Sequence, residues 1–358
     1  MEGMVKDNGR LKVAVTGHNG FIGPLLVKLL LDKGYEVIGI DTNYFDASCA
    51  FYPFQQCVKE IVKDIRQVTL EDLEGVYAVC HLAALSNDPL GQFNPELTLD
   101  LNYKASVQLA QTAKKAGVKK FIYSSSCSMY GIAGEEALTE DAEFNPVTAY
   151  AKSKVLTEQA ILPLVDKNFS VTTLRNATAY GVSSKLRVDL VLNNLVGWAV
   201  TTGQIKILSD GTPRRPLIHA EDIARAFVAV IEAPMAVVSR QAFNVGINRE
   251  NYQIKEIAAM IQEKIPHCKV VMTGEHGSDS RTYTVNFDKI YRLLPNFKPQ
   301  WTVRRGIEQL LEFYKKYALS QERFEGRYFI RLKQLQYLID SQEIDGANLY
   351  WRKEGVLT

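Results

Sequence analysis

The sequence has 358 residues, enough to bury the hydrophobic core of one large domain or of two. Its composition, 46% hydrophobic and 23% charged, is that of a globular enzyme, and a formal net charge of +2 gives no indication of nucleic-acid binding. The five cysteines have neither CxxC pairing nor metal-ligand spacing. There is no signal-peptide pattern at the start and no apolar stretch long enough to cross a membrane. We therefore expect a cytoplasmic protein without a disulfide framework, a metal site or a membrane span.

The first half of the chain alternates strand and helix patterns. Valine-rich residues from Leu11 predict a strand, and after a glycine turn a helical periodicity runs on to Gly34. YEVIGID predicts the next strand, which completes a βαβ unit. Further strands are expected in KEIVKDI, VYAVCHLAA and KFIYSSS, and helices over 97–117 and 148–162. This order predicts an α/β fold with a doubly wound parallel sheet, the Rossmann fold, and helices on both faces.

After about Gly181 the pattern loosens. Residues 188–203 look helical, SDGTPRRP (209–216) is typical of a turn-rich loop, and HAEDIARAFVAVIEAP predicts an amphipathic helix. QAFNVG predicts a late strand that rejoins the sheet. We expect a sheet domain over 11–181 to which 218–247 return, a smaller discontinuous substrate lobe over 182–217 and 248–318, and a basic-aromatic helical extension over 319–358. We expect that extension to pack against the protein or a second copy.

A glycine-rich turn, TGHNGFIG, places Gly17, Gly20 and Gly23 between the first strand and the first helix. Glycines let the backbone approach a pyrophosphate closely, and the helix N-terminus offers it N–H groups and a positive dipole end. No Gly-Lys-Ser/Thr follows, so this is not a Walker loop. Asp41, at the end of the second strand, is placed to accept hydrogen bonds from both ribose hydroxyls of adenosine and would repel a 2′-phosphate. The loop and Asp41 therefore predict NAD rather than NADP.

Tyr150 and Lys154 lie four residues apart in a predicted helix and share one of its faces. A lysine cation beside a phenol lowers the pKa of the phenol from about 10 towards neutrality. A serine hydroxyl opposite them would hold a substrate oxygen while Tyr150 removes its proton as a hydride leaves. The serine-rich SSSCSMYG precedes this helix. Tyr-x-x-x-Lys alone is common in proteins, but with the glycine loop upstream it predicts hydride-transfer chemistry.

Together these motifs resemble those of the extended short-chain dehydrogenases/reductases, in the nucleotide-sugar epimerase/dehydratase family. The resemblance covers residues 11 to about 290 and rests on TGHNGFIG, Asp41, Asp64-Ile65, HLAA (81–84), Asn102, SSSCSMYG, YAKSK, LRNATAYG and RPLIHAEDIARAF. It implies that Ser126, Tyr150 and Lys154 are catalytic. It implies an NAD site formed by Gly17, Asn19, Gly20, Phe21, Ile22, Gly23, Asp41, Asp64, Ile65, Leu82, Ala83, Ala84, Asn102, Ser124, Ser125, Tyr150 and Lys154.

The resemblance also implies a nucleotide-diphosphate sugar as substrate, held in part by Ser126. Arg215 matches the family's arginine on the substrate diphosphate, and Arg281 resembles a second one; on the pattern alone both would be surface residues. Asn194, with Asn193, either lines the nucleotide pocket or lies on the surface of a helix. By spacing alone, Asp64 either reaches the adenine or is an ordinary strand-end residue.

The residues after Ser126 bear on the reaction that the resemblance implies. The 4,6-dehydratases carry an Asp-Glu pair there, and this chain has Cys127 and Ser128; the 3,5-epimerase pattern places a cysteine one position later. What remains is oxidation at C4 with return of the hydride to the opposite face, a 4-epimerisation through a 4-keto sugar. Two departures bear on the substrate: Thr178 replaces a phosphate-contacting asparagine, and Ser86 stands where some 4-epimerases have lysine.

Two other functions use the same sequence features. A nucleotide-sugar C4 dehydrogenase or 4-ketoreductase needs the same residues and turns over free NAD(H), so the sequence hardly separates it from an epimerase. A non-catalytic NAD-binding protein of this fold often lacks the tyrosine or the lysine, and this chain keeps both. Helices 97–117 and 148–162 resemble the pair that forms a four-helix interface in this family, so we expect a homodimer.

Overall fold

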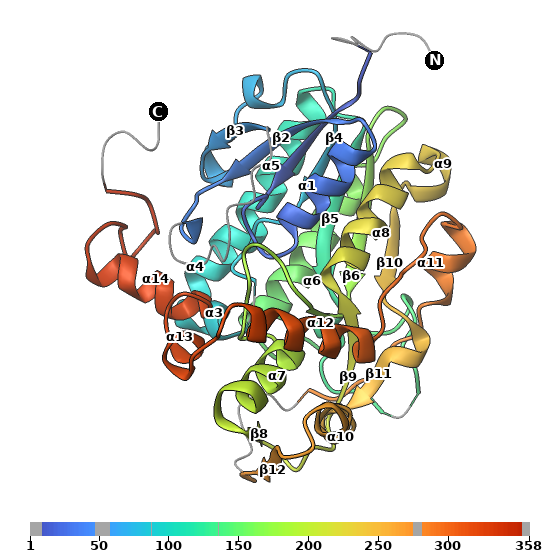
Figure 1. The fold of residues 1–358 in the computed structure, drawn as a ribbon. Coiled ribbons are helices and arrows are strands. Elements are labelled where there is room, and N and C mark those ends of the chain that lie inside the picture. The colour runs from blue at the N-terminus through green and yellow to red at the C-terminus, as the bar shows by residue number, and fades with distance from the viewer. Residues whose placement is uncertain (1–8, 47–57, 87, 135, 275–280, 353–358) are drawn as a thin grey trace.

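A seven-stranded sheet forms the centre of the molecule (Figure 1). In this computed structural model, which describes residues 9–46, 58–86, 88–134, 136–274 and 281–352, all neighbouring strands of the sheet are parallel. In spatial order the strands are β10 (Gln241–Val245), β6 (Ser170–Asn176), β5 (Lys120–Ser126), β4 (Val76–His81), β1 (Lys12–Thr16), β2 (Glu36–Asp41) and β3 (Lys59–Val62). The order reverses at β1, which confirms the doubly wound topology. Ligands bind at the carboxyl ends of the strands beside such a reversal.

The two faces of the sheet are covered by separate helix pairs. Val13 and Val15 of β1 pack into one core with α1 (Gly23–Asp32) and α8 (Ala220–Glu232), while Ala14 packs into another with α5 (Ala105–Lys115) and α6 (Ala149–Ile161). This alternation follows from the strand period of two. Figure 1 shows α1 and α8 side by side in front of the sheet, with α5 and α6 behind it. The late strand β10 rejoins the sheet beside β6, as QAFNVG predicted.

The helix expected over 97–117 is interrupted. After α3 (Asp88–Phe93), α4 (Pro95–Leu99) leads into a five-residue π-helix, Asp100–Lys104, before α5 continues. A π-helical turn rotates the side chains that follow it relative to a regular helix, and such turns are frequent at functional sites. Here the segment carries Asn102 towards the loop after β4.

The remainder of the chain forms a second hydrophobic core around α7, α10 and α12. A three-stranded sheet and a parallel strand pair belong to this part, and Arg214–Pro216, expected in a loop, lie in its strand β9 because they pair with β11. Its elements are β7 (Thr178–Tyr180), α7 (Val191–Thr202), β8 (Gln204–Ile207), β9 (Arg214–His219), β11 (Asn251–Gln253), α10 (Ile254–Lys264), β12 (Lys269–Met272) and α12 (Val303–Lys316). Two short helices, α9 (Met235–Val238) and α11 (Asp288–Leu293), pack with the first core instead.

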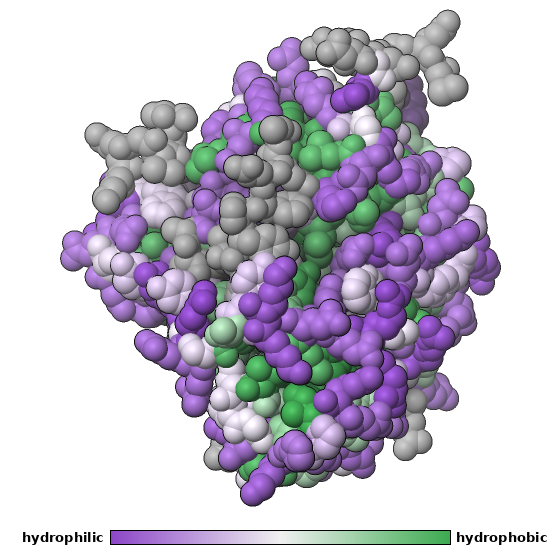
Figure 2. All heavy atoms as spheres, in the orientation of Figure 1, coloured by the Kyte–Doolittle hydropathy of each residue, from purple (hydrophilic) through white to green (hydrophobic). Residues whose placement is uncertain are grey.

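The C-terminal extension is not one continuous helix. It consists of α13 (Gln321–Glu325), α14 (Arg331–Asp340) and a non-helical segment in which Ile344 pairs with Trp351. Within the described residues no helix is long and apolar enough to cross a membrane. Figure 2 shows apolar side chains along a band from the upper to the lower part of one face, between hydrophilic groups.

Three of the cysteines, Cys80, Cys127 and Cys268, are buried thiols without a disulfide partner, as expected. Cys49 and Cys57 lie outside the described residues.

Candidate active site

A cavity of about 1030 Å³ lies at the carboxyl ends of β1, β4, β5 and β6, bordered by residues of the second core. It brings together nearly all the residues expected from the sequence. Those in its wall are Gly17, Asn19, Gly20, Phe21, Ile22, Gly23, Asp41, Asp64, Ile65, Leu82, Ala83, Ala84, Ser86, Ser124, Ser125, Ser126, Tyr150, Lys154, Thr178, Asn194, Arg215 and Arg281. Asn102 is the exception.

The glycine loop between β1 and α1 is packed too tightly for side chains. Gly17 has a φ of +75°, and a Cβ there would lie 2.7 Å from the backbone nitrogen of Ala83. A Cβ on Gly23 would lie 2.3 Å from the carbonyl oxygen of His18. No side chain caps the N-terminus of α1, and this end of the helix meets the cavity at Ile22 and Gly23, where its positive dipole end favours an anionic ligand. The loop therefore fits the pyrophosphate of a dinucleotide.

Asp41 faces the cavity at the end of β2. One oxygen accepts a hydrogen bond from the backbone N–H of Asn19 at 3.0 Å and the other from that of Asn43 at 3.0 Å. These contacts fix the carboxylate, and each oxygen retains acceptor capacity for a ribose hydroxyl. Asp64, after β3, also lines the cavity, with its carboxylate gripped by Arg66.

Asn102 lies beneath the cavity rather than in its wall. Its side chain accepts from the N–H of Leu85 at 2.8 Å and donates to the carbonyl of Leu85 at 3.1 Å. The π-helical turn and burial direct it to this loop, so it supports the cavity wall from Leu82 to Ser86. The cofactor contact expected of Asn102 stays a prediction, and in this structure its side chain holds the loop after β4.

Several buried polar atoms of the wall lack a partner among the described residues. They are the hydroxyls of Ser125 and Ser128 and the side-chain oxygen of Asn176. Asn176 otherwise donates to the Ser124 hydroxyl at 3.1 Å. Because buried polar groups are nearly always hydrogen-bonded, these atoms indicate a polar ligand in the cavity.

The three catalytic candidates converge from β5 and α6. Thr148 caps α6 by accepting from the N–H of Ala151 at 3.1 Å, which places Tyr150 in the first helical turn. Lys154 lies one turn on, with its ammonium 5.5 Å from the Tyr150 ring centroid. Ser126 ends β5 and accepts from the N–H of Ser128 at 3.2 Å.

Burial shifts the pKa values of Tyr150 and Lys154. Burial, then the Asp88 carboxylate, raises the pKa of Tyr150 to about 12, against the opposing effects of the Ser126 hydroxyl, Arg187 and Arg281. Burial lowers the pKa of Lys154 to about 7, and its ammonium donates to the carbonyl of Ser124 at 2.7 Å. Lys154 is therefore tied to the sheet, and these protein groups alone do not bring Tyr150 near neutrality.

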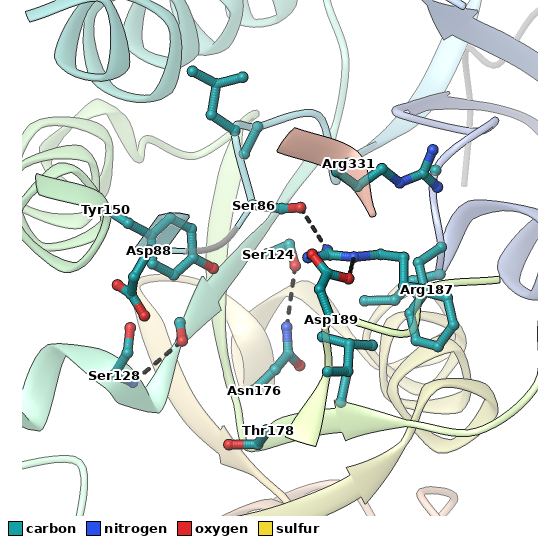
Figure 3. A pocket seen from close by; sticks show the side chains of 18 of the residues that line it. Ser86, Asp88, Ser124, Ser128, Tyr150, Asn176, Thr178, Arg187, Asp189 and Arg331 are labelled. Carbon is teal, nitrogen blue, oxygen red and sulfur yellow. Dashed lines mark hydrogen bonds and ion pairs between the residues drawn. The ribbon is translucent and has the colours of Figure 1, made fainter. Parts of the chain in front are cut away.

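Asp88 is a cavity residue that the sequence analysis missed. It accepts from the Thr148 hydroxyl at 2.6 Å and pairs with Arg281, whose guanidinium lies 2.7 Å away. Figure 3 shows its carboxylate beside Tyr150 and near Ser128. In the sequence it looks like an ordinary first-turn aspartate of a short helix, so no local signal identifies it.

Arg187 and Asp189, just before α7, were also missed. Arg187 holds both oxygens of Asp189, at 2.9 and 2.8 Å, and donates to the Ser86 hydroxyl at 2.8 Å. Figure 3 shows this trio across the cavity from Tyr150. Ser86, which stands where some 4-epimerases have lysine, thus contacts an arginine from a distant segment of the chain. Only the fold brings these positions together.

The remaining substrate candidates have mixed roles. Thr178 points into the cavity from β7 (Figure 3), while the amide of Asn194 donates to the carbonyl of Val188 at 3.0 Å. Arg215, which on the pattern alone would be a surface residue, is buried on β9 and donates to the backbone of Arg214 at 2.8 Å and to that of Arg281.

Cys127, directly after Ser126, is fully buried and does not line the cavity. Its thiol contacts the carbonyl of Arg175 at 3.0 Å, and burial raises its pKa well above its usual range. It therefore cannot act as the acid of a dehydration. Among the described residues no group of three or more candidate ligands is arranged to hold a metal ion.

Comparison with known proteins gives one family. The model of the NAD-dependent epimerase/dehydratase family matches residues 13–246. The chain is 26% identical over 318 residues to a UDP-glucuronate 4-epimerase of Thermodesulfobacterium geofontis, covering 84% of this chain and 95% of that protein. It is 28% identical over 331 residues to a UDP-glucose 4-epimerase of Bacillus subtilis, covering 84% and 94%.

A solved structure is similar to this chain over most of its length. The complex of MoeE5 with UDP-glucuronic acid and NAD superposes with a TM-score of 0.74 at 26% identity, covering 86% of this chain and all of that one. The glycine loop, Asp41 and the cluster of Ser126, Tyr150 and Lys154 line one cavity of this chain. The chain belongs to the NAD-dependent epimerase/dehydratase family and is an NAD-dependent enzyme of nucleotide sugars.

Proposed function

We propose that the enzyme epimerises a nucleotide sugar at C4 through a transient 4-keto sugar. The observation that carries this proposal is the hydroxyl pair of Ser126 and Tyr150 in a cavity whose wall has no acid at positions 127 and 128. Relatives named as UDP-glucose and UDP-glucuronate 4-epimerases support a UDP-sugar as substrate.

In this mechanism, Ser126 and Tyr150 bind the C4 oxygen of the sugar together. Tyr150, as phenolate, removes the hydroxyl proton, and Ser126 donates a hydrogen bond to the oxygen as it becomes a carbonyl. The glycine loop and Asp41 would hold NAD, which would supply a reversible hydride acceptor for C4, so that the hydride could return to the other face of the same carbon. In the return step Tyr150 gives its proton back to the oxygen.

Lys154 contributes charge and position. Its pKa of about 7 places it between its charged and neutral forms at physiological pH. Hydroxyl groups of a bound cofactor that accept hydrogen bonds from the ammonium would favour its charged form and raise that pKa. The protonated lysine then favours the phenolate form of Tyr150.

The stereochemical change requires the keto sugar to turn over while its nucleotide stays anchored. Arg215 and Arg281 supply guanidinium groups for the diphosphate, and Asn194 and Thr178 complete that end of the pocket. Asp88 pairs with Arg281 near Tyr150, so these groups also border the space in which the sugar rotates.

In this proposal, residues 11–181 and 218–247 hold NAD, and 182–217 and 248–318 hold the sugar nucleotide. The second core, formed by apolar residues of 180–217, 257–268 and 303–329, supports such a division, whereas the apolar side chains of 283–297 pack in the core of the sheet domain. The composition and cysteine content support a cytoplasmic location.

A Tyr150→Phe variant tests the catalytic assignment. Removing the hydroxyl removes the base, so kcat with a UDP-sugar should fall by about 10²–10⁴-fold while co-purified NAD stays constant. Tyr291→Phe, which deletes a hydroxyl bonded to the carbonyl of Gly246 outside the cavity, should retain full activity. Full turnover in the Tyr150 variant would overturn the assignment.

A further inference from the structure

The segment from Arg331 to Arg352, here called the C-terminal cap, folds back onto the edge of the sheet where β2 and β3 end. Its α14 is followed by a chain reversal in which Ile344 pairs with Trp351. The family match ends at residue 246, far before this segment.

The cap contacts the loop after β2, which follows Asp41. The indole N–H of Trp351 donates to the carbonyl of Thr42 at 2.8 Å, and its ring centroid lies 5.5 Å from that of Tyr44. The Tyr44 hydroxyl donates to the carbonyl of Leu349, and Gln334 donates to the carbonyl of Tyr44 at 3.2 Å. Thr42 and Tyr44 both line the cavity.

The cap also holds the loop after β3, through Arg66. Its guanidinium grips the Asp64 carboxylate at 3.0 and 2.8 Å, and donates to the carbonyl of Asn348 at 2.7 Å. The Tyr350 ring lies against the same guanidinium, with its centroid 4.0 Å from Cζ. The orientation of Asp64 in the cavity wall therefore depends on a contact made by the cap.

An apolar cluster fastens the cap to the body of the protein. Leu335, Ile344 and Leu349 are fully buried against Tyr44 and against leucines near the cavity, namely Leu85, Leu97 and Leu101. Arg331, at the start of α14, lines the cavity itself and lies with its Cζ 4.2 Å from the Phe45 ring centroid. These buried apolar contacts make the cap part of the hydrophobic core of the protein.

We propose that the C-terminal cap supports the wall of the adenosine subsite from behind and sets how long NAD stays bound. The inference rests on the proposed NAD site, with the adenosine ribose at Asp41; Asp41 and Asp64 both line the cavity. For the adenosine to leave, the loops after β2 and β3 must separate. The cap joins both loops, so release requires its contacts to open first. This device suits an enzyme that recycles one cofactor molecule.

The test compares NAD release from full-length, NAD-loaded variants. Trp351→Ala removes the bond to Thr42 and the packing on Tyr44, and we expect NAD to leave at least tenfold faster into an enzymatic NAD-degrading trap. Tyr328→Ala, an exposed aromatic residue that precedes the cap, should match the wild type. Equal release rates for the Trp351 and Tyr328 variants would overturn the proposal.

A measurement on the unaltered protein covers the case in which Trp351→Ala does not fold. Because coupling between two sites is reciprocal, adding NAD to the stripped protein should slow hydrogen exchange at the amides of residues 344–352. Unchanged exchange there, with slowed exchange in the glycine loop at 17–23, would contradict the proposal. Neither measurement needs a sugar nucleotide, so cap-dependent NAD release without epimerase activity would count against the proposed function alone.

Discussion

Around Tyr150 the pKa of the phenol is set by groups from four separate segments of the chain. Burial and the Asp88 carboxylate raise it, and the Ser126 hydroxyl, Arg187 and Arg281 lower it. Asp88 is held in place by the same threonine that caps the helix of Tyr150. The residue that starts the catalytic helix thus also positions the charge that opposes ionisation of the base.

Replacing Asp88 by asparagine should shift the pH dependence of the reaction. The aspartate charge disfavours the phenolate, so its removal lowers the pKa of Tyr150. The acid limb of kcat/KM against pH should move to lower pH by roughly one unit. Asp141→Asn, an exposed site, serves as control and should leave the profile in place. A shift to higher pH would show that Asp88 assists ionisation.

Sequence patterns were informative about residues whose role depends on local backbone. Gly17 and Gly23 sit where a Cβ would clash, and that requirement is visible as a glycine turn between a strand and a helix. Asp88, Arg187 and Asp189 gave no such signal, because their roles come from partners far away in the sequence. The causes that raise the pKa of Tyr150 gave no signal for the same reason: burial and the position of Asp88 are properties of the fold.

At the scale of elements, α5 and α6 lie together on one face of the sheet with a solvent-exposed side. On α6, Lys152 and Leu156 are exposed four residues apart, while the opposite side of the helix carries the buried Lys154 and Glu158. We propose that these two helices form the four-helix interface of a homodimer. Leu156 is one of the few exposed large apolar side chains of the described residues.

A Leu156→Lys variant tests the dimer. In the proposed interface, a positive charge at this position would repel Lys152 and the equivalent residues of the second subunit. The dimer dissociation constant should therefore rise at least tenfold, equivalent to ~1.4 kcal/mol. Light scattering coupled to gel filtration over a dilution series measures this. Leu70→Lys, at an exposed leucine remote from these helices in sequence, should not change the dissociation constant. A wild-type protein that is monomeric throughout would refute the interface.

Element prediction was most accurate where one periodicity ran unbroken. The buried strands and α8 followed from their hydrophobic patterns. The break at Asp100–Lys104 and the strand at Arg214–His219 did not, because a π-helical turn and the pairing of a strand with β7 and β11 depend on tertiary contacts. The C-terminal extension was expected to be helical and packed, and its non-helical return onto β2 and β3 has no local signature.

At the scale of the whole molecule, the parallel sheet, the second core and the C-terminal cap enclose one cavity. The sheet supplies the cofactor loop and Ser126, the second core supplies Arg215, and the cap packs behind Asp41 and Asp64. The proposed epimerisation is internal redox chemistry with no net change in NAD. Its defining step is the return of the hydride to the carbon that lost it.

A UDP-sugar with deuterium at C4 tests this most directly. Purified enzyme, without added NAD, is incubated with UDP-glucose, UDP-glucuronate or UDP-N-acetylglucosamine labelled in this way, and the product is examined by NMR and mass spectrometry. The account predicts the C4 epimer of at least one of these sugars, with deuterium retained at C4 and no free NADH. Loss of deuterium to released NADH with a 4-keto product, or turnover only with added NAD, would contradict it and identify a C4 dehydrogenase.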